Sequence, residues 1–368
     1  MNIDNIRKIE LEITSDCNAA CPGCARTQNL DILKVHYFGF EDIKRLFPTE
    51  QHIKDKQFKF CGVLGDPALN KECVDMVEYL STNGGFCQLS TNGAYQTADW
   101  WYKLGELSAQ TKNVEVNFCV DGHAETNHIY RVNTNWKVLN RNMQAYSDGG
   151  AGKAKATWIF IVFDHNEYEL ETAKEHASNL GFKFATRTGM RNSYHDWVAQ
   201  IKKKDVVQKK VVTEEKTITT TGKKEHSKVA VVKELDKFIK DYKQEPKSEE
   251  LQEAKKKILP TIQCKLIHEG EIYIGADLTL WPCCFLYDSN FKNKDGIVEK
   301  LQEYATGWND LKTKTIDEVL QHPWYNKVLA ESWDPDHNKH LSRCIRTCAY
   351  NKAYHNEIKF EDKKDVVQ

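Results

Sequence analysis

Residues 8–26 read KIELEITSDCNAACPGCAR, and the interpretation of the whole chain depends on this stretch. Its first six residues predict a β-strand, and Asn18, Pro22 and Gly23 then oppose regular structure. Cys17, Cys21 and Cys24 lie in the resulting loop with the spacing C-x3-C-x2-C. Three thiolates in a loop can hold a cube of four irons and leave one iron open. A zinc site is the alternative, although three cysteines alone do not complete a tetrahedron.

Strand and helix patterns alternate from this stretch to about Arg187. The predicted strands are residues 8–13, 58–64, 86–91, 114–120, 158–163 and 182–187. Between them, residues 41–47, 71–82, 98–108, 135–147 and 167–181 carry apolar side chains at helical spacing. Repeated strand–helix units with right-handed crossovers form a parallel sheet. Since six units are fewer than the eight of a complete barrel, we expect an α/β fold built as a partial (β/α)6 barrel.

The composition is that of a globular protein whose thiols stay reduced. The 368 residues suffice for one large domain and a smaller one, and the net charge of −1 gives no reason to expect nucleic acid. The opening residues MNIDNIRKIE lack an apolar signal region, and no run of about 18 apolar residues predicts a membrane span. We therefore expect a cytoplasmic protein in which clustered cysteines of the 12 bind metal, whereas the scattered Cys61, Cys73 and Cys87 are expected to pack in the core.

Composition also divides the chain into four parts. Residues 1–195 contain the strand–helix units, 196–260 form a lysine-rich insert with a predicted helix at 229–242, 261–352 contain five cysteines, and 353–368 form a charged tail. The insert is predicted to be a solvated connection or, alternatively, an arm that docks an acidic partner. After Pro260 we expect a β-hairpin over residues 272–281, which presents Cys283 and Cys284 at its end, and a helix over 315–333.

Polar motifs stand at the carboxyl ends of the predicted strands. They are Gly65-Asp66-Pro67 after the second strand, Thr91 and Asn92 at the end of the third, Cys119, Asp121 and Arg131 at the end of the fourth, Asn166 after the fifth and Arg187 at the end of the sixth. Ligands of parallel α/β sheets bind at this edge, which favours a binding role for Gly65-Asp66-Pro67. A cofactor-binding role for the whole set is what the family resemblance described below implies. An ordinary turn is the alternative for Gly65-Asp66-Pro67, and a structural role is the alternative for Asn166 and Arg187.

The cysteine spacing and these motifs resemble those of the radical S-adenosylmethionine (SAM) superfamily. The resemblance implies that Cys17, Cys21 and Cys24 hold a [4Fe–4S] cluster whose open iron chelates SAM. Reductive cleavage of SAM would then give a 5′-deoxyadenosyl radical that abstracts hydrogen from a substrate. Three positions depart from the family pattern: Gly23 replaces an aromatic residue, Asp66 a glutamate and Cys119 a serine.

The same resemblance implies roles for the motif residues. Gly65-Asp66-Pro67 would bind the methionyl amino group of SAM, and Thr91-Asn92 would lie near its ribose. Arg131 would contact the SAM carboxylate, which suits a guanidinium by charge and by bidentate geometry.

A second set of cysteines lies in the last third of the chain. The segment CKLIHEGEIYIGADLTLWPCC, residues 264–284, resembles the opening of the SPASM and twitch domains, although Leu278 stands where a glycine is usual. This resemblance implies one auxiliary [4Fe–4S] cluster with Cys284 as an alternate ligand. Its ligands would be Cys264, Cys283, Cys344 and Cys348. A zinc site with the same four thiolates is the competing interpretation.

The resemblance implies an enzyme, an oxidoreductase or a related radical-based modifying enzyme. Its substrate would be a small metabolite or a peptide, oxidised or crosslinked, and its electron donor a protein such as flavodoxin or ferredoxin. The catalytic residues beyond the cofactor ligands stay unassigned. Two alternatives remain, namely a non-catalytic iron–sulfur electron-transfer protein and a radical SAM enzyme that modifies RNA through its basic insert.

Overall fold

The computed structural model describes residues 1–187, 259–293, 297–301, 304–334, 336–338, 340–349 and 358–360. The lysine-rich insert, its predicted helix at 229–242 and most of the charged tail therefore lie outside the described residues. Within the described parts, no helix has both the length and the apolar character that crossing a membrane requires.

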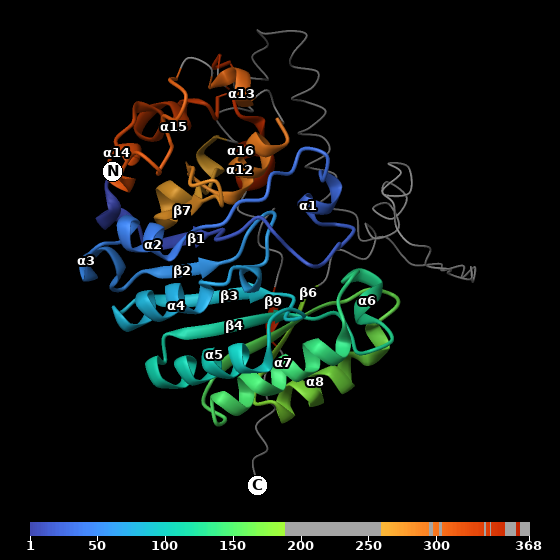
Figure 1. The fold of residues 1–368 in the computed structure, drawn as a ribbon. Coiled ribbons are helices and arrows are strands. Elements are labelled where there is room, and N and C mark those ends of the chain that lie inside the picture. Colours follow the sequence, from blue (N-terminus) through green and yellow to red (C-terminus); the bar gives the residue numbers. More distant parts are fainter. Residues whose placement is uncertain are drawn as a thin grey trace, which may run out of the picture.

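A nine-stranded sheet in the order β8-β7-β1-β2-β3-β4-β5-β6-β9 forms the centre of the molecule (Figure 1). The strands are β1 Lys8–Leu11, β2 Gln57–Phe60, β3 Phe86–Thr91, β4 Val114–Cys119, β5 Lys155–Ile161, β6 Lys183–Arg187, β7 Glu271–Ile274, β8 Leu280–Trp281 and β9 Ile358–Phe360. Strands β1 to β6 are neighbours in chain order and all run parallel. The sheet is not closed, because β8 and β9 lie at its opposite edges. The predicted α/β fold and partial barrel are therefore confirmed.

Helices cover one face of this sheet. They are α2 Phe40–Leu46, α3 Glu50–Ile53, α4 Cys73–Thr82, α5 Ala98–Thr111, α7 Trp136–Gly149 and α8 Leu170–Asn179, with shorter turns at η1 Ile3–Asn5, α1 Ala25–Gln28, η2 Pro67–Leu69, α6 Asn127–Tyr130 and η3 Glu167–Glu169. Thr97 caps α5 by accepting the N–H of Trp100, and Asn135 caps α7 in the same way. Gly181, with φ of 76°, follows α8 as the predicted stop.

The opposite face of β2, β3 and β4 is polar and partly open. Buried and half-buried residues alternate along these strands. The buried set packs against the helices: the Phe118 ring lies 5.2 Å from that of Trp101 and 5.7 Å from that of Tyr146. Successive side chains of a strand point to opposite faces, so the half-buried set lies on the inner side. It comprises Gln57, Lys59, Phe86, Gln88, Ser90, Glu115, Asn117 and Cys119.

The C-terminal residues extend the sheet instead of forming a separate layer. Strand β7 pairs in parallel with β1, and β8 returns antiparallel to β7, which is the predicted hairpin. Figure 1 shows the remaining elements gathered beside this edge. They are η5 Leu259–Thr261, the π-helical turn η6 Lys265–Glu269, α12 Cys284–Phe291, α13 Ile297–Lys300, α14 Ile316–Leu320, the π-helical turn η8 Trp324–Val328, α15 Leu329–Glu331 and α16 Ser342–Cys348.

One expectation about this region was wrong in detail. The helix predicted over 315–333 is interrupted between α14 and η8, where Pro323 has no N–H to donate to the preceding turn. Within the charged tail, β9 pairs antiparallel with β6 at the far edge of the sheet.

Candidate functional site

The three N-terminal cysteines lie together beyond the carboxyl end of β1. Cys17 and Cys24 pack, partly buried, against a small apolar cluster that contains Cys21 and Tyr130. Burial raises the pKa of the Cys21 thiol to about 11 and also raises the pKa of Cys17, and the neighbouring thiols act in the same direction. Burial thus disfavours ionisation of the Cys17 and Cys21 thiols, and a positively charged centre would favour their thiolate forms.

Hydrogen-bond donors point at two of the three sulfurs. The amide of Asn92 lies 3.8 Å from Cys17 Sγ, and the Arg131 guanidinium lies 3.9 Å from Cys21 Sγ. Within the described ranges, no three His, Cys, Asp or Glu side chains have the geometry to hold a single metal ion. A four-iron cube holds its thiolates further apart than one ion does. The donor set, three thiols with donors at their sulfurs, fits such a cluster.

Asp66 connects the two motifs at the ends of β2 and β3. One carboxylate oxygen accepts the Ala68 N–H and the Thr91 hydroxyl, at 3.0 and 2.8 Å. The other accepts both the main-chain and the side-chain N–H of Asn92, each at 2.8 Å. Every strong acceptor position of Asp66 is thus used inside the protein. The structure makes Asp66 the residue that positions Asn92 against Cys17.

Gly65 is required by a close approach of two loops. A Cβ atom at this position would lie 1.7 Å from the carbonyl oxygen of Thr14, just before the cysteine loop. The N–H of Asp66 then donates to the carbonyl of Asp16 at 2.8 Å. Pro67 occupies the first position of η2, which Asp66 caps. The predicted Gly65-Asp66-Pro67 motif is therefore packed directly against the loop that bears Cys17.

Two arginines face the end of β4. Arg131 Nε donates to Asp121 at 2.7 Å, and the other oxygen of Asp121 accepts the N–H of Ile161 at 2.7 Å. Burial raises the pKa of the Cys119 thiol, while the charges of Arg131 and Arg187 act in the opposite direction. The Nε of Arg187 is buried and has no hydrogen-bond partner among the described residues. An orphaned donor beside Arg131 suits a carboxylate ligand at this point.

Asn166 is used entirely within the fold. Its amide nitrogen donates to the carbonyls of Asp121 and Ile161, and its oxygen accepts the N–H of Phe163. The side chain is fully buried. This arrangement favours the structural role that the sequence also allowed, whereas Arg187 keeps a donor for a ligand.

Four C-terminal cysteines form a second buried group. Cys264 caps η6, Cys283 caps α12, and Cys344 and Cys348 lie one turn apart on α16. Burial raises the pKa of the Cys344 thiol well above its ordinary value, and the charges of the other three cysteines act in the same direction. All four are buried, and the N–H of Gln263 binds the Cys348 carbonyl at 3.0 Å. Four thiols are the number that a fully ligated iron–sulfur cluster requires, whereas no three of them have the geometry to hold a single metal ion in the described part of the chain.

Cys284 lies beside the sheet. Burial raises the pKa of its thiol, and the next contributions come from Glu10, whose charge raises it, and Lys265, whose charge lowers it. Glu10 lies on β1 and Cys283 also acts on Cys284, so Cys284 stays an alternate ligand.

Glu12 is a residue of the site region that the sequence interpretation missed. It follows β1, is 1% exposed, and accepts the N–H groups of Leu64 and Gly65 at 2.6 and 3.1 Å. Burial raises the pKa of this carboxyl from 4.5 to about 7, although these hydrogen bonds and that of Tyr273 act in the opposite direction. Its position in a predicted strand, two residues after Glu10, was the available signal for an inward carboxyl group.

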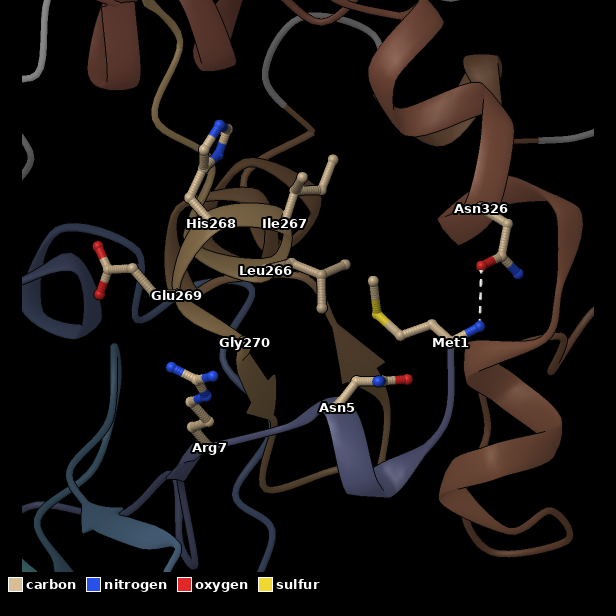
Figure 2. A pocket seen from close by; sticks show the side chains of 9 residues that line it. All are labelled: Met1, Asn5, Arg7, Leu266, Ile267, His268, Glu269, Gly270 and Asn326. Atoms are coloured by element: carbon tan, nitrogen blue, oxygen red, sulfur yellow. Dashed lines mark hydrogen bonds between the residues drawn. The ribbon is translucent and has the colours of Figure 1, made fainter.

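A surface pocket of about 450 Å³ is lined in part by residues 266–270, the turn that follows Cys264 (Figure 2). Arg7 and Gly270, which precede β1 and β7, line it together with Met1, whose amino group donates to Asn326 at 3.3 Å. It therefore lies at the amino edge of the sheet, opposite to the N-terminal cysteines. None of the predicted site residues lines it.

The central strands form an open parallel sheet, and three cysteines follow its first strand. The chain has the fold of the radical SAM enzymes. Streptococcus suis SuiB bound to the precursor peptide SuiA matches with a TM-score of 0.52 at 10% identity, over 88% of this chain and 66% of that chain. A second SuiB structure matches with a TM-score of 0.51 at 11% identity, over 88% and 69%. This chain thus spans about two thirds of SuiB. No family model and no curated protein matches the sequence.

Proposed function

We propose that this chain is a radical SAM enzyme that abstracts hydrogen from a small metabolite or peptide, in an oxidation or crosslinking reaction. One observation carries the proposal: three thiols lie at the carboxyl edge of an open parallel sheet, with Asn92 and Arg131 at their sulfurs. A [4Fe–4S] cluster with SAM, bound there, would supply a 5′-deoxyadenosyl radical as the hydrogen acceptor.

The arginines provide the anchor for SAM in this proposal. Arg131 is oriented by its ion pair with Asp121, and Arg187 brings a buried donor to the same place. Two guanidinium groups suit the carboxylate of SAM, and Cys119 between them is too weak a donor to replace a serine hydroxyl. Asp66, which also accepts the Thr91 hydroxyl, holds the side chain of Asn92 in position.

The inner face of the sheet is the proposed substrate surface. Lys59, Gln88, Ser90, Glu115 and Asn117 are half-buried there, on the face opposite to the one that α4, α5 and α7 cover. Amide, hydroxyl and charged groups in a row suit a substrate with several hydrogen-bonding groups. The peptide bound to SuiB, a protein of similar fold, is a ligand of this kind.

The auxiliary cysteines favour oxidation among the reactions considered. Loss of a hydrogen atom removes one electron and one proton from the substrate, and an oxidised product requires that a second electron and a second proton leave. Four buried thiols can hold an auxiliary [4Fe–4S] cluster that takes this second electron. We infer that flavodoxin or ferredoxin supplies the electron that starts each cycle, and that the protein works in the cytoplasm.

Anaerobic reconstitution tests the proposal directly. The full chain is loaded with iron and sulfide, reduced with dithionite in the presence of SAM, and analysed for 5′-deoxyadenosine and methionine. We expect both products, and their loss in the variant Cys17→Ala/Cys21→Ala/Cys24→Ala. The matched control is Cys87→Ala, which removes a buried thiol that faces α4.

Iron content and spectroscopy complete the test. The triple variant should keep the auxiliary cluster. Changing Cys264 and Cys344 to Ala should remove the auxiliary cluster. Wild-type protein that carries both clusters and yet releases no 5′-deoxyadenosine would contradict the proposed activity. If the triple variant contains zinc and no iron, the four auxiliary cysteines hold a structural zinc ion and no cluster.

A further inference from the structure

A buried ion network connects the auxiliary cysteines to the sheet. Lys265, the residue after Cys264, lies 2.5 Å from Glu271 and 3.7 Å from Glu10. Lys59 on β2 reaches the same two carboxylates, at 3.3 Å from Glu271 and 3.9 Å from Glu10. The four side chains are 1–23% exposed. The network is neutral overall, and it contains one lysine on each side of the carboxylates.

The two lysines differ in what else they face. Lys265 directly follows the proposed ligand Cys264. Lys265 and Arg343 also stand over the ring of Phe285, at 5.6 and 5.4 Å from its centre, and Phe285 and Arg343 each lie within two residues of another proposed ligand. Lys59 instead lies on β2, on the inner face of the sheet. Lys265 is therefore the lysine of the network that lies beside the neighbours of the auxiliary thiols.

A fixed cation close to a buried cluster changes how easily the cluster accepts an electron. Reduction adds one negative charge, and a cation within a low-dielectric interior stabilises the charged product. The carboxylates that balance Lys265 are anchored on the strands β1 and β7. The arrangement thus favours the reduced form of whatever cluster these cysteines hold.

We infer that Lys265 is a positioning residue that raises the reduction potential of the auxiliary centre and so fits that centre to accept an electron from the substrate. The inference rests on the auxiliary cluster of the proposed function. It gives the ion network a role beyond stability, since a buried ion pair contributes little net stability compared with apolar residues.

Two matched double variants test the inference. Lys265→Met/Glu271→Gln and Lys59→Met/Glu271→Gln each remove one lysine and the same carboxylate, so neither leaves an unbalanced buried charge. Both are made in the full chain that carries Cys17→Ala, Cys21→Ala and Cys24→Ala, in which only the auxiliary cluster remains. Its midpoint potential is measured by redox titration followed by electron paramagnetic resonance.

The expected result is a difference between the two variants. Loss of Lys265 should shift the reduction equilibrium at least tenfold toward the oxidised cluster, about 59 mV for one electron. Loss of Lys59 should shift the reduction equilibrium by clearly less. Lys265→Arg keeps the positive charge and should therefore keep the potential of the parent protein. Equal potentials in the two double variants would overturn the role of Lys265 and leave the auxiliary cluster in place. Failure of the parent variant to assemble any cluster would overturn both.

Discussion

Replacement of Glu12 by glutamine should stabilise the protein at neutral and alkaline pH. The carboxyl group is 1% exposed and accepts two main-chain N–H groups through the same oxygen. A Cβ atom at Gly62 would lie 2.2 Å from that oxygen, so the main chain closes over the carboxyl group. A glutamine side chain keeps the accepting oxygen and has nearly the same size. The substitution therefore changes the charge and little else.

The sign and the size of the change in the free energy of unfolding follow from the pKa of Glu12. Burial raises the pKa of Glu12 from 4.5 to about 7, so the folded protein binds the proton more tightly than the unfolded chain does. The stability from this group is fully present below pH 4.5 and is lost as the pH rises through about 7. At 1.36 kcal/mol for each unit, the loss amounts to about 3 kcal/mol. Glu12→Gln should thus match the wild type near pH 5 and exceed it by about 3 kcal/mol near pH 8.

Urea unfolding of the metal-free, reduced protein measures this effect, as the difference between variant and wild type at each pH. The control is Glu318→Gln. Glu318 is fully exposed, and the N–H and hydroxyl of Thr315 hold its pKa below the ordinary value. It therefore titrates below this pH range and should give parallel curves. Parallel curves for Glu12→Gln as well would refute the buried, proton-binding state of Glu12.

Two further predictions concern side chains in unusual environments. Arg131→Leu leaves the fully buried Asp121 without its ion-pair partner and should lower the free energy of unfolding by about 3–5 kcal/mol. Adding Asp121→Asn should recover much of that loss in the same urea experiment. Leu278 is buried with φ of 64°, a conformation that costs an L-residue about 1–2 kcal/mol. Leu278→Gly should therefore unfold at higher urea than Leu278→Ala, the reverse of the usual order.

The sheet of the barrel could be predicted because its signals are local. Apolar spacing and turn residues located β1 to β6 within a few residues of their observed bounds. The pairing of β7 with β1 joins residues that are more than 250 positions apart, and no local pattern carries that information. The break at Pro323 is different. The sequence contains the proline that ends the helix, but the helical spacing of the apolar residues favoured one continuous helix.

The site shows the same division between local and long-range signals. Spacing alone identified Cys17, Cys21 and Cys24 as a group, because all three lie in one loop. Nothing in the sequence ranked Asn166 above Arg187 or below it. In the structure the Asn166 amide makes its hydrogen bonds within the fold, whereas the Arg187 Nε has no partner among the residues that the structure describes. The position of Leu278 shows why a glycine is usual there, since the hairpin turn requires a left-handed conformation.

The pairing of β1 with β7 also determines how the two cysteine groups relate to each other. Cys17 follows β1 at its carboxyl end, whereas Cys264 lies one π-helical turn before β7, at the amino side. Because the two strands run parallel and pair Leu11 with Ile274, the groups lie toward opposite ends of the same strand pair. The ion network of Glu10, Lys59, Lys265 and Glu271 joins the same strands from the inner face. A change in the distance between the two cysteine groups would disrupt both the β1–β7 hydrogen bonds and the ion pairs of this network. A substrate on the inner face would therefore meet a hydrogen acceptor and an electron acceptor that the sheet holds at a fixed separation.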